Sequence, residues 1–362
     1  MEYPVIMNRL TRNSLFPPEV TARFPSTRYQ GSKAKLTDWI WSHLAGLDFC
    51  TCLDAFGGTG VVSSRLKQEG KQVTYNDILR FNYYFGLALV ENDNVFLEDK
   101  DISWVLKRHK DIDYPTFIQD TFGGIYFTDE ENAWLDQTIT NTRHLDDRFL
   151  FALSFFALAQ SCIVKRPYNL FHRKNLYVRL ADVKRSFGNK ASWDRPFPEW
   201  FKYFAHEANQ AVAPGIFPCR ASNKDAMEID EEYDLVYIDT PYISRQGVAV
   251  DYADFYHFLE GLCFYDRWKE LIDWESKHRR MLRNPNPWTD KKTVHKAFDE
   301  LFSKFSKSII VVSYRSDGVP SINELSTLLK RYKSAVRIET FGRYKYVLSK
   351  NGNSKEALII GT

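Results

Sequence analysis

An apolar segment that runs directly into a glycine-rich loop constrains the fold of this chain more than any other feature. Residues 52–60 read Cys-Leu-Asp-Ala-Phe-Gly-Gly-Thr-Gly, and a helical pattern begins near Val61. Glycine allows the backbone to turn with positive φ and lets a ligand approach the main chain closely. The pattern therefore predicts a buried strand, a ligand-binding loop and a helix, as in nucleotide-binding α/β sheets.

The segments around this loop alternate between strand and helix patterns. A second strand pattern, residues 71–76, ends in Asp77, where such sheets place the acid that accepts ribose hydroxyls. Helical patterns cover 34–45, 61–69 and 81–92, and further strand patterns cover 232–238 and 308–313. This alternation predicts an α/β fold with a mostly parallel sheet flanked by helices.

The remaining segments suggest an insertion and an antiparallel end to the sheet. Helical runs at 129–142 and 146–161 interrupt the alternation, and 252–268 and much of 269–306 also carry helical patterns. Residues 337–340, 344–349 and 356–360 predict strands closed by a hairpin around Asn351-Gly352. We expect an extended arm over 1–27, a catalytic domain formed by 28–92 and 220–362, and an inserted helical, basic domain over 93–219.

A second candidate ligand site is the pentad Ile238-Asp239-Thr240-Pro241-Tyr242 at the end of an apolar run. A carboxylate, free turn carbonyls and a flat ring at one strand end suit a planar amine. The alternative is a strand that stops at a proline turn, with Asp239 as a turn residue and Tyr242 as packing. Because the glycine loop also indicates a ligand on the same sheet, we favour the binding site.

Charge is distributed unevenly although the net charge is only +3. Residues 91–136 hold 12 acids against 4 Lys and Arg, whereas 160–204 hold 10 Lys and Arg against 3 acids. Aromatic residues interleave with these cations, a mixture suited to phosphates and exposed bases. A solvated basic surface is an equally weighted alternative. The candidate nucleic-acid-binding cations are Lys165, Arg166, Arg173, Lys174, Lys184 and Arg185.

Other features narrow the class of protein. The most apolar stretch, 149–159, is shorter than the roughly 20 residues of a membrane span, and no secretory signal pattern precedes the fold. Five scattered cysteines favour reduced thiols in a cytoplasm. Cys50-Thr51-Cys52 lacks a second pair with zinc-site spacing, so we predict no structural metal.

A dinucleotide dehydrogenase is the first competing function. Gly58-Thr59-Gly60 followed by Asp77 also matches the start of the Rossmann fingerprint. The third glycine of that fingerprint falls on Ser63, however, and a dehydrogenase would leave Asp239 without a role.

The chain resembles the Dam-like class of S-adenosylmethionine-dependent DNA N6-adenine methyltransferases. The resemblance covers most of residues 28–362 and depends on several motifs that occur in the order of the family. They are Tyr29-Gln30-Gly31-Ser32-Lys33, Asp54-Ala55-Phe56-Gly57-Gly58-Thr59-Gly60, Asp77, the looser match 166–171, Asp239-Thr240-Pro241-Tyr242, 252–257 and 355–360. The resemblance implies a Rossmann-like methyltransferase fold with an inserted target-recognition domain.

The resemblance also implies roles for the candidate cofactor residues. Asp77 takes the ribose hydroxyls of S-adenosylmethionine, while Tyr29, Gly31 and Lys33 close over its methionine end. Asp225 lies where the family often has an acid near the adenine amine of the cofactor, with a solvated turn acid as an equal alternative. The cofactor-binding set is completed by Asp54, Phe56, Gly58 and Gly60.

The turn at 239–242 is the expected catalytic element. The Asp239 carboxylate and the main-chain carbonyl of Thr240 accept the hydrogens of the target amine, and Tyr242 stacks on the extruded base. Thr240 stands where the family usually has proline. Threonine supplies the same carbonyl, so we expect activity to survive.

We therefore predict a site-specific methyltransferase that modifies adenine N6 in duplex DNA with base flipping. The alternatives are a cytosine-N4 or RNA N6-adenine methyltransferase, because the turn recognises an exocyclic amine rather than adenine itself, and a catalytically inactive DNA-binding relative. The expected partner is double-stranded DNA, with a cognate restriction enzyme as a candidate. We expect a cytoplasmic monomer without metal or membrane contact.

Overall fold

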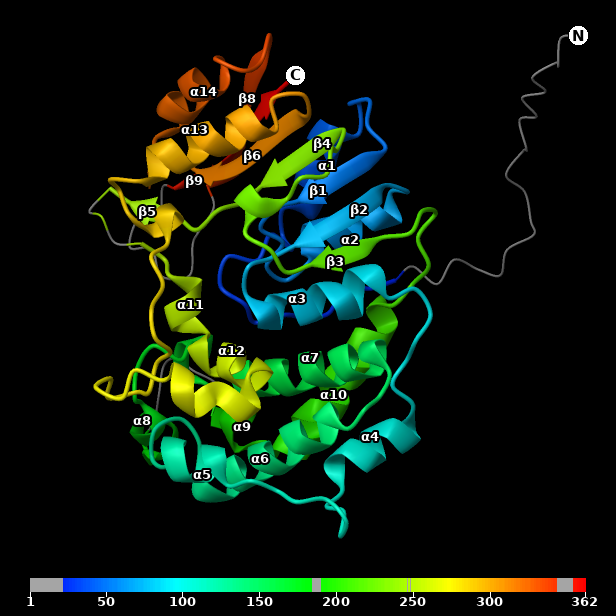
Figure 1. Ribbon diagram of the computed structural model, residues 1–362, viewed down its shortest axis with the longest axis vertical. Helices are drawn as coiled ribbons and strands as arrows, with labels where there is room; N and C mark the ends of the chain where they lie inside the picture. Colours follow the sequence, from blue (N-terminus) through cyan, green and yellow to red (C-terminus); the bar gives the residue numbers. More distant parts are fainter. Residues whose placement is uncertain (1–21, 184–189, 246, 248, 344–353) are drawn as a thin grey trace, which may run out of the picture.

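The computed structural model describes residues 22–183, 190–245, 247, 249–343 and 354–362. Its centre is a seven-stranded sheet in the order β3-β2-β1-β4-β6-β9-β8 (Figure 1). The strands are β1 Thr51–Asp54, β2 Gln72–Asn76, β3 Arg220–Ser222, β4 Leu235–Ile238, β6 Ile309–Arg315, β8 Val336–Arg343 and β9 Lys355–Gly361. A separate two-stranded sheet pairs β5 Ile243–Ser244 with β7 Gly318–Val319.

The predicted α/β architecture is confirmed. Strands β3, β2, β1, β4 and β6 are parallel, and β9 lies antiparallel between β6 and β8. The predicted strand at 344–349 and the Asn351-Gly352 turn lie outside the described residues, as do the first 21 residues of the predicted arm. The short edge strand β3 has no counterpart among the predicted strands.

Helices cover both faces of the sheet because its strands are apolar on both sides. Side chains such as Cys52, Tyr75 and Tyr237 pack with α1 (Thr37–Leu44) and α2 (Val61–Gln68). Their neighbours in sequence, including Leu53 and Ile238, pack on the opposite face with α13 (Val294–Lys304) and α14 (Ile322–Leu329).

A layer of helices lies beside the part of the molecule that contains the sheet (Figure 1). Its helices are α3 Arg80–Gly86, α4 Asp99–Leu106, α5 Phe117–Phe122, α6 Asp129–Arg143, α7 Arg148–Val164, α8 Leu176–Leu180, α9 Lys190–Asp194, α10 Phe197–Ala211, α11 Tyr252–Phe255 and α12 His257–Cys263. Buried side chains of α7 and α10 share one core with α3 and α12. This core therefore combines the predicted insertion with helices from the predicted catalytic part.

Three helical predictions need correction. The pattern at 252–268 is divided among α11, α12 and a 3₁₀ segment, Tyr265–Leu271. A Cβ built on Gly261 would lie 1.8 Å from the Trp268 ring, so the chain folds back there instead of continuing as a helix. Beyond the end of that 3₁₀ segment, only Pro287–Thr289 and α13 are helical within 269–306. The pattern at 81–92 begins as α3 and ends in a π-helical turn, Leu87–Glu91.

Candidate active site

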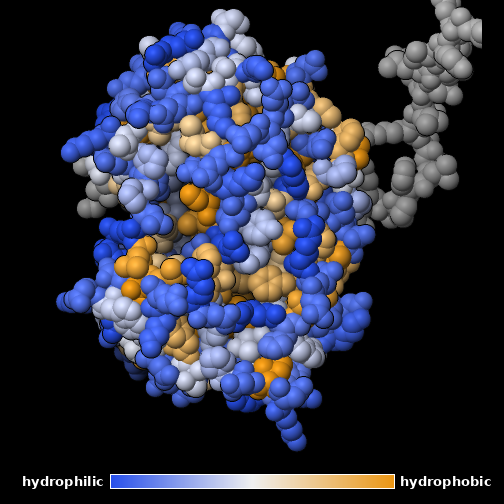
Figure 2. Space-filling view, in the orientation of Figure 1, coloured by the Kyte–Doolittle hydropathy of each residue, from blue (hydrophilic) through white to orange (hydrophobic). Residues whose placement is uncertain are grey.

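A cavity of about 550 Å³ lies at the carboxyl ends of β1, β2 and β4, where the surface is hollowed between the sheet and the helical layer (Figure 2). The loop after β1, Asp77 after β2 and Asp239 after β4 all line it. Parallel strands bring their carboxyl ends to one edge of a sheet, which explains why these distant residues meet. All the predicted cofactor residues line this cavity except Gly60, which is the N-terminal cap of α2.

The glycine loop has the geometry that its sequence predicts. Gly58 and Gly60 have φ of +53° and +80°, a backbone conformation that favours glycine. A Cβ built on Gly57 would lie 2.1 Å from the Tyr75 ring. The Tyr75 hydroxyl donates to the Gly58 carbonyl at 2.7 Å, so the ring of the second strand holds the loop in place.

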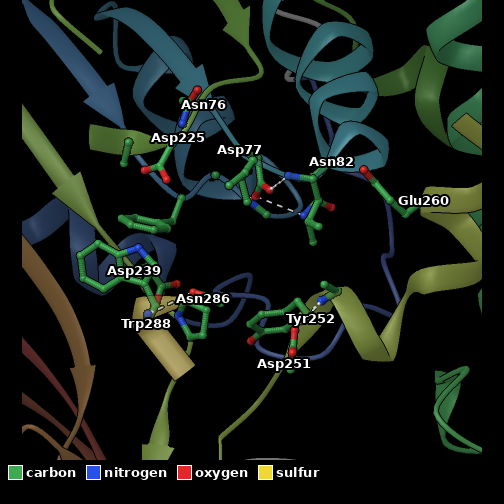
Figure 3. A pocket seen from close by; sticks show the side chains of 18 of the residues that line it. Asn76, Asp77, Asn82, Asp225, Asp239, Asp251, Tyr252, Glu260, Asn286 and Trp288 are labelled. Atoms are coloured by element: carbon green, nitrogen blue, oxygen red, sulfur yellow. Dashed lines mark hydrogen bonds between the residues drawn. The ribbon is translucent and has the colours of Figure 1, made fainter. Parts of the chain in front are cut away.

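Asp77 is buried and organises the wall of the cavity (Figure 3). Its carboxylate accepts hydrogen bonds from the N–H groups of Gly58 and Leu79, each at 2.9 Å, and from the Asn82 amide at 3.1 Å. Burial raises the pKa of Asp77 to about 6, although these hydrogen bonds oppose the shift. Asn82 also lines the cavity, and sequence reasoning missed it because a single amide on a helix carries no distinguishing pattern.

Two further acids of the predicted set lie on the same cavity. Burial raises the pKa of Asp54 to about 7, and the Ser63 hydroxyl donates to its carboxylate at 2.6 Å. Asp225 accepts a hydrogen bond from the Met227 N–H at 3.0 Å and so caps a 3₁₀ turn. Asp225 therefore has a local structural role and also faces the cavity (Figure 3).

The segment 29–33 closes the cavity from the side of the helical layer. The Tyr29 ring stacks against Tyr256 at 4.6 Å and against Tyr252 at 5.4 Å between ring centres. Gly31 has φ of +85°, and a Cβ there would lie 2.4 Å from the Tyr252 hydroxyl oxygen. The two sequence motifs at 29–33 and 252–257 are therefore one packed unit.

Lys33 belongs to the Asp239 side of the cavity. Its ammonium nitrogen lies 2.8 Å from each carboxylate oxygen of Asp239 and 3.5 Å from Oε1 of Glu356, and it also contacts the Tyr242 hydroxyl. Burial raises the pKa of Asp239, the Lys33 cation opposes that shift, and the Glu356 carboxylate adds to it. Glu356, from β9, is completely buried and was missed because it lies inside an apolar strand pattern.

The structure corrects the predicted position of the Tyr242 ring. The ring is 4% exposed, packs edge-on against Tyr314 and is absent from the cavity wall, so it offers no stacking platform there. Its hydroxyl instead donates to Asp239 at 2.7 Å. Asp239 and Pro241 line the cavity, whereas Thr240 is buried behind it.

The cavity has additional lining residues that sequence reasoning did not select. Glu260 accepts the N–H groups of Arg80 and Phe81 at the start of α3, and burial raises its pKa to about 7. Trp288 packs edge-on against Phe56 at 5.0 Å, and Asn286 lies beside it (Figure 3). Glu260 lies on α12, whereas Asn286 and Trp288 lie in the short turn around Pro287–Thr289, and none of the sequence motifs included these residues.

Two of the predicted DNA-binding cations are structural. Lys165 is 2% exposed and donates to the carbonyls of Trp193 and Arg195 at 2.6 and 2.7 Å. Arg166 is 1% exposed, and its guanidinium donates to the Tyr126 carbonyl at 2.8 Å. A buried cation that is committed to internal carbonyls cannot reach a DNA phosphate, so both assignments were wrong.

Of the other four predicted cations, two are described by the structure and two are not. Arg173 and Lys174 are exposed and remain candidates for DNA contact. Lys184 and Arg185 lie outside the described residues.

Among the described residues, no group of three or more His, Cys, Asp or Glu is placed to hold a metal ion. Within the same ranges, no helix combines the length and apolar character needed to cross a bilayer.

A glycine loop, a buried acid after the second strand, and Asp239 and Pro241 of the turn after β4 meet on one cavity, as expected of an α/β methyltransferase. The sequence model of the D12 class N6 adenine-specific DNA methyltransferases matches residues 29–316, and the chain belongs to this family. The predicted family and enzyme class are thereby confirmed.

Curated relatives agree with this assignment. The chain is 27% identical to the Type II methyltransferase M2.HphI of Haemophilus parahaemolyticus over 93% of this chain and 97% of the relative. It is 24% identical to the Type II methyltransferase M.NlaIII of Neisseria lactamica, with 90% and 95% covered. It is 27% identical to the Type II methyltransferase M.FokI of Planomicrobium okeanokoites over 91% of this chain but only half of that longer protein.

Proposed function

We propose that this methyltransferase takes its methyl group from S-adenosylmethionine and transfers it to adenine N6 at a short site in duplex DNA. The observation that carries the proposal is the shared cavity, which joins Asp239 to the glycine loop and Asp77. A nucleotide-like cofactor and a target amine would therefore meet in one enclosed space.

The groups that line the cavity match the parts of such a cofactor. Asp77 offers carboxylate oxygens to ribose hydroxyls, and the glycine loop leaves the main chain open because Gly58 carries no side chain. Phe56 supplies an apolar wall, and Asp225 is available to an exocyclic amine. S-adenosylmethionine supplies an electrophilic methyl group on its sulfonium.

Asp239 acts on the target amine. The lone pair of an adenine amine is delocalised into the ring, and two hydrogen-bond acceptors at its hydrogens localise that lone pair on nitrogen. The Asp239 carboxylate faces the cavity as the first acceptor, and the Thr240 carbonyl, although this residue is buried behind the cavity wall, would be the second, so preorganised electrostatics and positioning carry the rate enhancement. The Lys33 ammonium and the Tyr242 hydroxyl, both in contact with Asp239, hold the carboxylate in one orientation.

Duplex DNA brings two further requirements. The target base has to leave the helix, because the Asp239 side chain is only 18% exposed and faces an enclosed cavity. Phosphates need exposed cations, and Arg173 and Lys174 are suitably exposed. The helical part around 93–219 would then carry target recognition, with 28–92 and 220–362 as the catalytic part.

The relatives support a biological setting as well as a reaction. Because the relatives are named Type II methyltransferases, we propose that a cognate restriction enzyme accompanies this chain. We further propose that the protein works as a monomer in the cytoplasm, where its DNA substrate and its cofactor are both present.

Asp239→Ala and Asp77→Ala test the proposal as a reciprocal pair. Asp239→Ala should abolish methyl transfer while calorimetric titration still gives wild-type affinity for S-adenosylmethionine. Asp77→Ala should weaken cofactor binding. Labelled S-adenosylmethionine and unmethylated genomic DNA, followed by mapping of the modified base, measure the reaction. Equal loss of cofactor affinity and rate in Asp239→Ala would remove Asp239 from the amine site.

A further inference from the structure

A hairpin rich in basic residues projects from the helical side of the molecule next to the cavity. We call residues 267–283 the basic hairpin. Its two sides are paired by the Leu282 N–H and the Leu271 carbonyl at 2.7 Å, and by the Asp273 N–H and the Arg280 carbonyl at 2.8 Å. In Figure 1 it is the yellow loop that extends beyond α12, close to α8.

The composition of the basic hairpin suits a polyanion. It contains six Lys and Arg against three acids, Glu270, Asp273 and Glu275. Lys269 and Lys277 are exposed and lie on its outer surface. The acid Asp273 is paired with Arg280 inside the hairpin at 2.9 Å, which leaves five Lys and Arg against two acids.

An exposed indole lies near the tip of the basic hairpin. Trp274 is 45% exposed, so much of its ring is available to a partner. Arg279 holds it in place, because its guanidinium lies 5.1 Å from the ring and donates to the Trp274 carbonyl at 2.7 Å. The ring is therefore an ordered apolar contact among cations.

The basic hairpin adjoins both the cavity and the other candidate DNA segment. Arg267, Met281 and Arg283 line the cavity. The Tyr126 hydroxyl oxygen lies 2.8 Å from the His278 carbonyl and 2.5 Å from the Phe171 carbonyl. Phe171 is two residues from Arg173, so one buried tyrosine connects the basic hairpin with the segment that carries Arg173 and Lys174.

We propose that the basic hairpin is a second DNA-binding element, in which Lys269 and Lys277 contact phosphates and Trp274 packs against the duplex beside the cavity. The proposal rests on DNA being the substrate. It assigns the DNA surface to two segments that are about a hundred residues apart in sequence but adjacent in the fold.

Two kinds of variant separate the charge contacts from the aromatic contact. Lys269→Gln with Lys277→Gln should flatten the dependence of log affinity on log salt by about 0.9 for each phosphate that the protein no longer neutralises. Trp274→Ala should weaken affinity by the same factor at every salt concentration, because no ion is released. Fluorescence anisotropy with a labelled duplex gives both quantities, and titration with S-adenosylmethionine confirms folding.

Lys296→Gln with Lys307→Gln is the matched control, since it removes the same charge from exposed lysines around α13. This control should keep the wild-type slope. The proposal is overturned if the Lys269 and Lys277 pair behaves like the control and Trp274→Ala binds as the wild type does. If Arg173→Gln with Lys174→Gln still reduces the salt slope of DNA binding by about 0.9 per lost phosphate contact, only the basic hairpin is misassigned.

A separate observation concerns Glu356. It lies on β9, is 0% exposed, and accepts the Ser313 hydroxyl at 2.7 Å. Its Oε1 is 3.5 Å from the Lys33 ammonium and 3.3 Å from the Tyr242 hydroxyl, the same two groups that contact Asp239. Other ionisable groups with which Asp239 interacts are Asp54, Tyr237, Tyr252 and Tyr314.

We infer that Glu356 is a positioning residue for Asp239 that shares the Lys33 ammonium with it. A cation divided between two carboxylates withdraws less electron density from Asp239 than a cation paired with Asp239 alone. Asp239 therefore remains a stronger acceptor for the target amine. The inference rests on the proposed role of Asp239.

Glu356→Gln tests this inference because it keeps the shape of the side chain and removes its charge. The turnover number should fall about tenfold, because Asp239 becomes a weaker acceptor in the transition state. KM for S-adenosylmethionine should stay unchanged. The acid limb of the pH–rate profile should move to lower pH, since the negative charge beside Asp239 is gone. Glu339→Gln on β8 is the control and should keep the wild-type profile.

An unmoved acid limb with unchanged turnover in Glu356→Gln would overturn the inference. If that variant does not fold, Glu356→Asp tests the same contact, because it keeps the charge but shortens the side chain and so withdraws the carboxylate from the Lys33 ammonium. Its turnover should fall while the acid limb stays in place, and full turnover would count against the inference. Asp239→Asn is measured alongside and should lose all activity. That result tests the role of Asp239 separately from the role of Glu356.

Discussion

Replacing Lys33 with methionine removes the cation of a buried charged cluster while nearly keeping its length. Lys33 is 4% exposed, and its ammonium lies 2.8 Å from Asp239 and 3.5 Å from Glu356. Taking one partner out of a buried ion pair typically costs about 3 to 5 kcal/mol, because the remaining charge stays buried without compensation. We expect the free energy of unfolding of Lys33→Met to fall by about that amount.

The same change has a defined pH dependence. The Lys33 cation lowers the pKa of Asp239, so its loss raises that pKa further above the usual value for aspartate. A carboxyl group with a raised pKa in the folded state favours folding when protonated, and this contribution disappears as pH rises through the raised pKa. Lys33→Met should therefore lose more stability at pH 8 than at a pH close to the usual pKa of aspartate, and the acid limb of its pH–rate profile should move to higher pH.

Urea unfolding at both pH values and a pH–rate profile measure these effects. Lys35→Met is the control, because Lys35 is exposed two residues away on the same segment. The double variant Lys33→Met with Glu356→Gln should recover part of the lost stability, since one of the two stranded carboxylates is removed. The reasoning is refuted if Lys33→Met keeps its stability and pH profile but loses cofactor affinity, as a lysine closing over the methionine end would.

Three further outcomes follow from the site and the insertion. Asp77→Ala and Gly58→Val should both weaken S-adenosylmethionine binding in calorimetric titrations, the first by removing a ribose acceptor and the second by placing a branched side chain at φ of +53°; wild-type affinity in both would end the assignment of this loop. Arg173→Gln with Lys174→Gln should reduce the salt slope of DNA binding by about 0.9 for each phosphate left without its cation, and an unchanged slope would exclude them. Arg166→Met should lower the urea midpoint strongly because the buried carbonyls of Tyr126 and Leu170 lose a donor, whereas an exposed DNA-contacting arginine would leave that midpoint unchanged.

Much of the fold and half of the site were predictable because they depend on local patterns. Strand patterns that end in Asp54, Asp77 and Ile238 correspond to β1, β2 and β4. Once these strands are parallel, their carboxyl ends meet at one edge, so the glycine loop, Asp77 and Asp239 have to share a site. The helix at 252–268 was mispredicted because Gly261 allows the Trp268 ring to fold back onto it, and hydrophobic periodicity gives no signal of such a fold-back.

The sequence by itself determined the order of strands and helices, the glycine loop and the acids that follow the strands, because hydrophobic periodicity and backbone preference act over a few residues. Only the tertiary structure decided which charged groups are enclosed and what they touch. Lys165 and Arg166 look like surface cations in sequence, yet packing buries them against carbonyls, while Lys33 and Glu356, more than three hundred residues apart, meet beside Asp239. A side chain's partners depend on which elements pack together, and that information is distributed over the whole chain.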